Sequence, residues 1–243
     1  MIGVMLTVFN QLQDTMRTLE SFARCTRLPY RLVIVDNAST DKTVRHLMRR
    51  GYELIANERS THGTVRINQG MRHLLANPAN RYLVWIHNDM LFFSGWLERL
   101  IEHLELDPSI GKLSPVFVND HDRGPGDAVF AEQWMCKFRH SFYPGNACPW
   151  IMKREVFEEV GWFDERYIGV GGYEDWDYNN RMIQRGYDVM ITKGSIVWHP
   201  MNGTRSKYDE FEATMHNRTY YANKWGTDRE IVSHTPEAAA LRR

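Results

Sequence analysis

Residues 31–41 read RLVIVDNASTD, in which a short run of apolar, mostly β-branched residues stops at a cluster of Asp, Asn, Ser and Thr. The run predicts a buried strand over Arg31–Val35, and the polar cluster predicts a turn into a helix. Three further strands of this kind are expected at Gly3–Phe9, Glu53–Ala56 and Tyr82–Ile86, with helical apolar spacing between them. This alternation predicts an α/β fold in which a parallel sheet is covered on both faces.

The pattern changes after a helix that is expected over about Ser94–Leu106, and the elements that follow are shorter. No Ser/Gly linker or low-complexity run separates two folding units. One domain is therefore expected over residues 1–226, with halves at 1–105 and 106–226, followed by a frayed tail at 227–243. The elements expected in the second half are helices at 153–160, 175–185 and 208–224 and strands at 149–152, 188–192 and 196–198.

The composition narrows the classes of partner and compartment. Thirty Lys and Arg residues balance thirty Asp and Glu residues, which argues against a general attraction to nucleic acid or to an anionic membrane. Three cysteines cannot all pair and show no C-x-x-C spacing, which indicates a reducing, cytoplasmic compartment. The longest apolar stretch, Tyr82–Trp96, contains polar residues at 87–89 and is shorter than the ~20 residues that cross a bilayer. No transmembrane segment is expected, while a nucleic-acid acceptor, peripheral membrane contact and the oligomeric state stay open.

Polar residues gather where the predicted strands end. Ligands of an open parallel α/β sheet bind in the crevice at the carboxyl ends of its strands. The first, second and fourth strands end in residues 7–10, 36–41 and 87–89, which contain carboxylates or carboxamides. A turn that caps the next helix explains residues 36–41 equally well, but it does not explain the coincidence with Asp89. The sequence therefore predicts a polar site at this edge of the sheet.

Eight segments, in collinear order, resemble the GT-A-fold nucleotide-sugar glycosyltransferases of family 2. The resemblance covers roughly Gly3–Gly226 and implies a Rossmann-like, mostly parallel central sheet flanked by helices in a single domain. It also implies a metal-dependent inverting enzyme that moves a sugar from a nucleotide-sugar donor to an acceptor hydroxyl. The segments are residues 7–10, 35–41, 63–70, 87–89, 157–165, 172–177, 198–200 and 217–226.

The resemblance assigns the nucleoside end of the donor to five residues. It implies that Asp36 accepts a hydrogen bond from the base and that Thr7 and Asn10 line the base and ribose. Arg66 is expected to approach the nucleotide, although a solvated helix charge is the alternative for an isolated Arg. Asn88 is expected to contact the ribose.

The resemblance also assigns a divalent cation, Mn²⁺ or Mg²⁺, to Asp89 and His199. A carboxylate is a hard ligand that suits either ion, whereas an imidazole suits Mn²⁺ better than Mg²⁺. Asp89 fills the last position of the family's D-x-D motif, which reads His87-Asn88-Asp89 here and lacks the first carboxylate. The alternative for His199 is a core histidine beside Trp198. Arg205 and Lys207 follow in a polar segment that either closes over the diphosphate or is a solvated loop.

A second group of acids follows a glycine-rich stretch at residues 169–172. By resemblance to the family's E-D motif, Asp175 is the general base that takes the proton of the acceptor hydroxyl. Asp177 is expected to be structural, and the alternative for the whole group is stabilisation of a helix N-terminus. The tryptophans 134, 150 and 176 could stack on sugar faces or serve as core. The residues expected to contact substrate or acceptor are Gly145, Asn146, Glu174 and Trp176.

The expected acceptor is a saccharide or a glycan-lipid precursor, and a protein side chain or a modified DNA base is the alternative. Two other classes stay open at this stage. A nucleotidyltransferase or metal-dependent hydrolase would share the sheet and the metal, but the first usually has a glycine- and basic-rich phosphate loop that is absent near residue 10. A non-catalytic sugar-binding module would bind its ligand without turnover.

Overall fold

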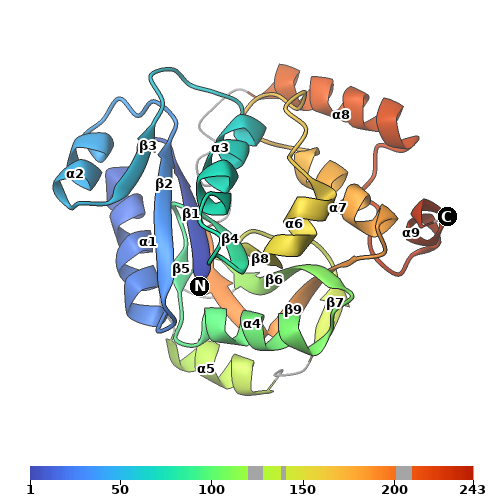
Figure 1. The fold of residues 1–243 in the computed structure, drawn as a ribbon, viewed down its shortest axis with the longest axis horizontal. Coiled ribbons are helices and arrows are strands. Elements are labelled where there is room, and N and C mark those ends of the chain that lie inside the picture. Colours follow the sequence, from blue (N-terminus) through green and yellow to red (C-terminus); the bar gives the residue numbers. More distant parts are fainter. Residues whose placement is uncertain (120–127, 138–140, 201–209, 243) are drawn as a thin grey trace.

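A computed structural model of the chain describes residues 1–119, 128–137, 141–200 and 210–242. Over these residues nine strands form one sheet in the order β3-β2-β1-β4-β8-β6-β9-β5, and β7 pairs with β9 off this path. Helices cover both faces of the sheet (Figure 1). The predicted α/β architecture with a central sheet flanked by helices is confirmed.

The first half of the chain alternates strands and helices as predicted, with boundaries that differ by one or two residues. Its elements are β1 (Ile2–Val8), α1 (Leu12–Cys25), β2 (Tyr30–Asp36), α2 (Thr43–Arg49), β3 (Glu53–Ala56), α3 (Gly63–Leu75), β4 (Tyr82–His87), β5 (Leu91–Phe92) and α4 (Trp96–Leu106).

Among the described residues, the second half adds three strands to the same path, a further strand, β7, that pairs with β9 off this path, and five helices. Its described elements are β6 (Ile110–Val118), α5 (Ala128–Lys137), β7 (Phe142–Pro144), β8 (Trp150–Lys153), α6 (Arg154–Val160), α7 (Glu174–Gln184), β9 (Asp188–Trp198), α8 (Phe211–Trp225) and α9 (Pro236–Leu241). The two strands expected at 188–192 and 196–198 are one strand, β9, whose pairing with β6 shifts register between Pro115 and Val116.

Strand direction brings both halves of the chain to one edge of the sheet. β1 is parallel to β2 and to β4, so that Thr7 lies opposite both Val35 and His87. β8 is antiparallel to β4 and to β6, and β9 is parallel to β6. The strands β1, β2, β3, β4, β6 and β9 therefore share one direction, and β8 starts at the edge where they end.

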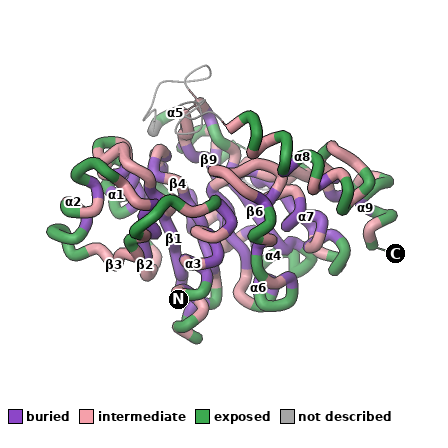
Figure 2. Tube along the Cα trace, turned by 90° about the horizontal axis from the view of Figure 1, so that it is seen from above, coloured by how far each residue is buried: buried purple, intermediate pink, exposed green. Residues whose placement is uncertain are grey.

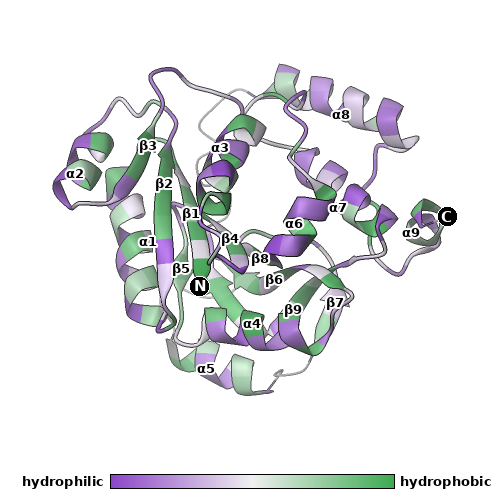
Figure 3. Ribbon diagram, in the orientation of Figure 1, coloured by the Kyte–Doolittle hydropathy of each residue, from purple (hydrophilic) through white to green (hydrophobic). Residues whose placement is uncertain are grey.

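Alternation along β1 shows how the sheet is buried on both faces. Val4, Leu6 and Val8 pack with apolar residues of α1 and α4, whereas Met5 packs with α3 on the other face. The second face continues under α6 and α7. Figure 2 shows these strands as the buried centre of the molecule, and Figure 3 shows that the hydrophobic colour is concentrated there.

The expectation of a frayed tail is wrong. Thr235 caps α9 by accepting a hydrogen bond from Ala238 N, and Ala238 packs with Ile183 of α7. Behind the helix, Arg242 pairs with Asp188 at the start of β9. A Thr-Pro helix start and one small apolar patch are enough to dock this segment, although its composition gave no periodic signal. None of the described helices is both long and apolar enough to cross a bilayer.

A buried charge network joins α7 to α8. The Asp177 carboxylate is fully buried and lies 2.6 Å from Lys224 Nζ and 3.1 Å from Arg181 Nε. Trp225 Nε1 donates to the same carboxylate at 2.9 Å, and Lys224 also lies 3.0 Å from Asp164. Asp177 thus fixes the end of α8 against the body of α7.

Replacement of Asp177 by Ala should lower the free energy of unfolding by about 3 kcal/mol, the lower end of the cost of removing one partner from a buried ion pair. The lower end applies because Lys224 and Arg181 keep some contact with water. Urea denaturation measures this difference. The control is Asp228→Ala. Asp228 is an exposed partner of Arg218, which lies in α8, and its removal should barely change the urea midpoint. Equal, small effects of both variants would contradict a structural role for Asp177.

Candidate functional site

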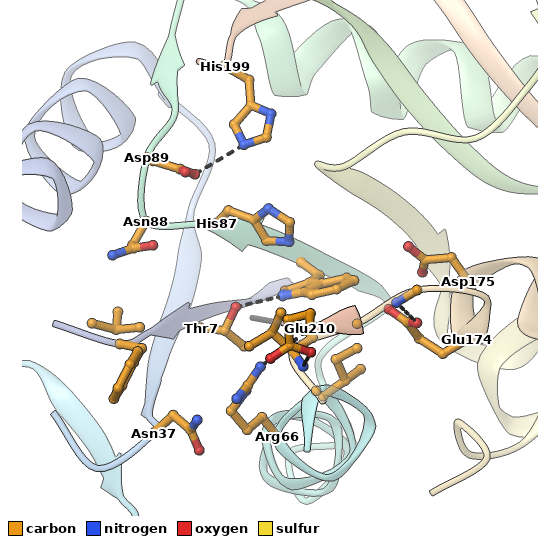
Figure 4. Close-up of a pocket in the computed structure, with 18 of the residues that line it drawn as sticks. Thr7, Asn37, Arg66, His87, Asn88, Asp89, Glu174, Asp175, His199 and Glu210 are labelled. Carbon is orange, nitrogen blue, oxygen red and sulfur yellow. Dashed lines mark hydrogen bonds and ion pairs between the residues drawn. The ribbon is translucent and has the colours of Figure 1, made fainter. Parts of the chain in front are cut away.

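A cavity of about 710 Å³ opens at the edge where the parallel strands end. Residues of β1, α3, β4 and α7 line it, together with residues that follow β9. Figure 4 shows that His199, Asp89 and His87 lie on one side, Asp175 and Glu174 on another, and Arg66 and Asn37 below them. Both halves of the chain contribute to this one cavity.

Three potential metal ligands converge at the ends of β4 and β9. His87, Asp89 and His199 each offer a ligand atom, and these atoms all lie within 4.8 Å of one another. Of these atoms, His199 Nε2 and Asp89 Oδ1 lie 3.1 Å apart. His199 is held in turn by its backbone N–H, which donates to Val118 O at 2.9 Å. In the part of the chain that the structure describes, this is the only such group of three or more His, Cys, Asp or Glu residues.

The protonation states of this group suit a cation. Burial, together with the nearby His199, lowers the pKa of His87 to about 4, so this imidazole is neutral at neutral pH. Burial alone would raise the pKa of Asp89, but the hydrogen bond with His199 and the charges of the two imidazoles hold that pKa below its ordinary value. A neutral imidazole and an ionised carboxylate are the forms that bind metals. Two nitrogens and one oxygen fit Mn²⁺ better than Mg²⁺.

His87 was not among the metal ligands predicted from the sequence. His87 stands where the D-x-D motif has its first carboxylate, and the absence of that carboxylate was interpreted as the absence of a ligand. The signal was nevertheless present, because His87 is the last residue of β4 and precedes Asp89 by two positions. A histidine at that position replaces the oxygen ligand by a nitrogen ligand.

The acids at the start of α7 lie in different environments. Glu174 Oε2 accepts a hydrogen bond from Gly172 N, which turns this carboxylate back toward the glycine-rich loop. Asp175 lines the cavity, and its Oδ1 is buried without a hydrogen-bond partner among the described residues. Burial raises the pKa of Asp175, and the positive charge of Lys112 acts in the opposite direction. Asp175 is thus an acid of α7 that lines the cavity and has one buried oxygen without a protein donor.

Arg66 lines the cavity from α3, where the sequence analysis expected it. Its Nη1 donates to Thr61 O at 2.9 Å and its Nη2 to Val170 O at 3.4 Å. Burial lowers the pKa of Arg66, and the charges of Glu174 and Glu210 oppose that shift. The guanidinium is therefore a positioned cation rather than a solvated helix charge.

Two of the predicted nucleoside contacts are not among the residues that line the cavity and bond instead to the loop that follows β2. Asp36 accepts from Ser39 N at 2.9 Å and from Ser39 Oγ at 2.5 Å. Asn10 Oδ1 accepts from Thr40 N at 2.8 Å. Asn37, which the sequence analysis did not single out, lines the cavity and donates from Nδ2 to Ser60 Oγ at 2.9 Å. The carboxylate of the preceding residue, Asp36, was the stronger sequence signal for a ligand contact, but it accepts hydrogen bonds from Ser39 within the turn.

The remaining predicted residues divide in the same way. Thr7, Asn88, Asn146 and Trp176 line the cavity. Gly145 is not among the lining residues. A Cβ there would meet Ile191 Cδ1 at 2.9 Å, so this glycine serves the packing against β9. Trp150 is 1% exposed and belongs to the core, and Trp134 packs with Phe130 in a smaller apolar cluster. Arg205 and Lys207 lie outside the described residues.

Comparison with known proteins places these observations in a family. The family model described as "Glycosyl transferase family 2" matches residues 4–161, well over half of the chain. Among solved structures, one described as "Crystal structure of GalNAc-T7 with UDP, GalNAc and Mn2+" superposes with a TM-score of 0.70 at 15% sequence identity. The match covers 92% of this chain and 47% of that one, so the chain spans about half of its length. At this identity the likeness shows the fold alone. No curated protein matches the chain.

The three convergent ligands predict that the free protein binds Mn²⁺ without any other ligand. Asp89→Asn should weaken this binding by at least about tenfold, the lower end of what losing even an outer-shell partner of a metal site costs. Electron paramagnetic resonance of free Mn²⁺ measures the affinity directly. Asp14→Asn, on the exposed face of α1, is the control and should leave it unchanged. Equal Mn²⁺ affinity in both variants would remove Asp89 from the site.

Proposed function

Since the chain belongs to glycosyltransferase family 2, we propose that it transfers a sugar from a nucleotide-sugar donor to an acceptor hydroxyl, with inversion at the anomeric carbon. One observation carries this proposal. A single cavity joins a group of three metal ligands to a carboxylate with an unpartnered oxygen. Transfer from a nucleotide donor requires both a site for the diphosphate and a base for the acceptor.

The donor occupies the side of the cavity formed by the first half of the chain. Thr7 and Asn37 contact the nucleoside, and Arg66 approaches the negative charge of the nucleotide. His87, Asp89 and His199 hold a divalent cation, which when bound supplies a Lewis acid for the charge of the leaving diphosphate. The proposal is supported by the solved structure of similar fold, which is described with UDP and Mn²⁺.

The acceptor enters from the side of α7. Its hydroxyl donates a hydrogen bond to the Asp175 carboxylate, which takes the proton as the new glycosidic bond forms and the bond between the sugar and the diphosphate breaks. The raised pKa of Asp175 makes it a stronger base than an exposed aspartate. A base placed across the cavity from the diphosphate supports displacement in one step, and therefore inversion. Trp176 offers an aromatic face to the acceptor, which we propose is a saccharide or a glycan-lipid precursor.

A donor panel tests this function. Purified protein is incubated with Mn²⁺ and UDP-, GDP-, dTDP- or CDP-sugars, first in a thermal-shift assay and then with monosaccharide and glycan-lipid acceptors. Release of a nucleoside diphosphate that depends on the acceptor is expected, and NMR of the product should show inverted anomeric configuration. Release of sugar phosphate would indicate a hydrolase if free nucleoside monophosphate forms with it, or a nucleotidyltransferase if the nucleotidyl group is joined to the acceptor. Binding without any turnover would indicate a sugar-binding module.

Asp175→Asn should lower turnover by about 10² to 10⁴, the usual range for loss of a general base. The amide keeps the shape of the side chain but cannot accept the proton, so nucleotide affinity should be unchanged. Steady-state kinetics and calorimetry on one preparation measure both quantities. Asp228→Asn, outside the cavity, is the control. Turnover of Asp175→Asn within a few-fold of the wild type would rule out Asp175 as the base.

Turnover should also fall on the acid side of its pH profile, because only the ionised Asp175 carboxylate can accept a proton. Burial raises the pKa of this group, so activity is lost as the pH falls through that raised value, above the ordinary range of an aspartate. A profile of turnover between about pH 4 and pH 9 checks this. A profile that stays flat down to the pKa of an ordinary aspartate would contradict it.

A further inference from the structure

A buried lysine lies beneath the proposed transfer site. Lys112, in β6, is 0% exposed, and its Nζ donates to Asn146 Oδ1 at 2.7 Å. The ammonium also lies 5.9 Å from the centroid of the Trp150 ring. Burial of a charge costs free energy unless the charge is paired and hydrogen-bonded, and an apolar side chain would fill this space without that cost. Packing alone therefore does not account for Lys112.

The groups that face Lys112 and Asp175 come from several elements. Burial lowers the pKa of Lys112, and the charges of Asp175 and then Glu230 oppose this shift most strongly. Glu230 follows α8, and burial raises its pKa. Burial likewise raises the pKa of Cys148, which precedes β8, and keeps it a neutral thiol. Glu174, on the same helix as Asp175, has a weaker effect on the pKa of Lys112. Lys112 is thus the cation on which these acids converge.

The hydrogen bond to Lys112 also fixes the orientation of Asn146. An ammonium only donates, so it selects the amide oxygen and turns the Asn146 Nδ2 group away from itself. No described residue accepts a hydrogen bond from this Nδ2 group, and Asn146 lines the cavity. The side chain therefore presents two N–H donors to whatever occupies that part of the cavity.

We propose that Lys112 is a positioning residue for sugar transfer, which holds the Asn146 amide with its N–H donors toward the substrate and places a positive charge beneath Asp175. This proposal rests on the function proposed above, and in it Lys112 acts through Asn146 and Asp175 without touching the substrate. Without Lys112 the amide can rotate by 180° and present its oxygen. The Asp175 carboxylate also loses the charge of Lys112, which among the described residues favours its ionised form.

Lys112→Met keeps the length of the side chain and removes both effects. The probes are UDP with Mn²⁺ for nucleotide affinity and, for turnover, the nucleotide-sugar and acceptor pair that is active with the wild-type protein in the donor panel. Turnover should fall by about a hundredfold, the cost of misplacing a reacting group by an ångström. UDP affinity should stay within about twofold, since Asn146 and Asp175 are not proposed to bind the nucleotide. The acid limb of the pH profile should move to higher pH.

Two controls separate positioning from folding. Lys153→Met removes a lysine that pairs with Glu105 outside the cavity and should change neither turnover nor the pH profile. Asn146→Asp keeps the contact with Lys112 as an ion pair but replaces the N–H donors with a carboxylate, and it should lose turnover as well. ¹³C NMR titration of the Asp175 carboxyl, which needs no substrate, should show a higher pKa in Lys112→Met than in the wild type.

The outcomes distinguish this proposal from the proposed function. A folded Lys112→Met protein with wild-type turnover and an unshifted Asp175 titration would overturn the role of Lys112 and leave the transferase intact. Parallel loss of UDP affinity and thermal stability, with full activity of Asn146→Asp, would make Lys112 merely structural. A wild-type protein that turns over no nucleotide sugar would refute the proposed function, while the NMR titration would still report whether Lys112 acts on Asp175.

Discussion

The common direction of six strands is the constraint on which the site depends. Because β4 and β9 run the same way, His87 at the end of one and His199 just beyond the other reach the same edge, although Asp89 and His199 are separated by 110 positions in the sequence. The antiparallel strand β8 connects the two groups of parallel strands and pairs with both β4 and β6. The two halves of the chain therefore cannot be treated as separate binding units, since neither contains the three ligands alone.

The loop before α7 depends on side chains for its backbone hydrogen bonds. Asn68 in α3 bonds to both Phe163 N and Phe163 O, and Asn217 in α8 bonds to Ile168 N and to the carbonyls of Ile168 and Gly172. Gly63 allows the loop to approach α3, because a Cβ there would meet Val170 O at 2.7 Å. The side chains of these two buried asparagines thus make the backbone hydrogen bonds that neighbouring strands would make in a sheet, and they fix the position of Asp175 at the cavity.

Sequence reasoning succeeded where periodicity carries the signal and failed where tertiary contacts decide. The βαβ alternation of the first half predicted β1 to β4, since each strand is a compact, mostly apolar run, including the edge strand β3, which is only partly buried. The proximity of Asp89 to His199 follows from no spacing and was available only through resemblance to a family. The use of Asp36 in a turn, the selection of Asn37 for the cavity wall and the docking of α9 depend on single hydrogen bonds and one small apolar patch. None of these leaves a periodic trace in the sequence.

The start of α7 shows why motif position does not determine chemical role. Three acids within four residues share the same helix N-terminus, whose dipole favours each of them equally. Glu174 is turned back to a loop amide, and Asp177 is neutralised by Lys224 and Arg181. Among the described residues, Asp175 has the charge of the buried Lys112 acting on it and keeps one oxygen without a hydrogen-bond partner. We therefore propose Asp175 as the base of this group, because a carboxylate already satisfied by protein donors has no lone pair left in position to accept a proton from a substrate.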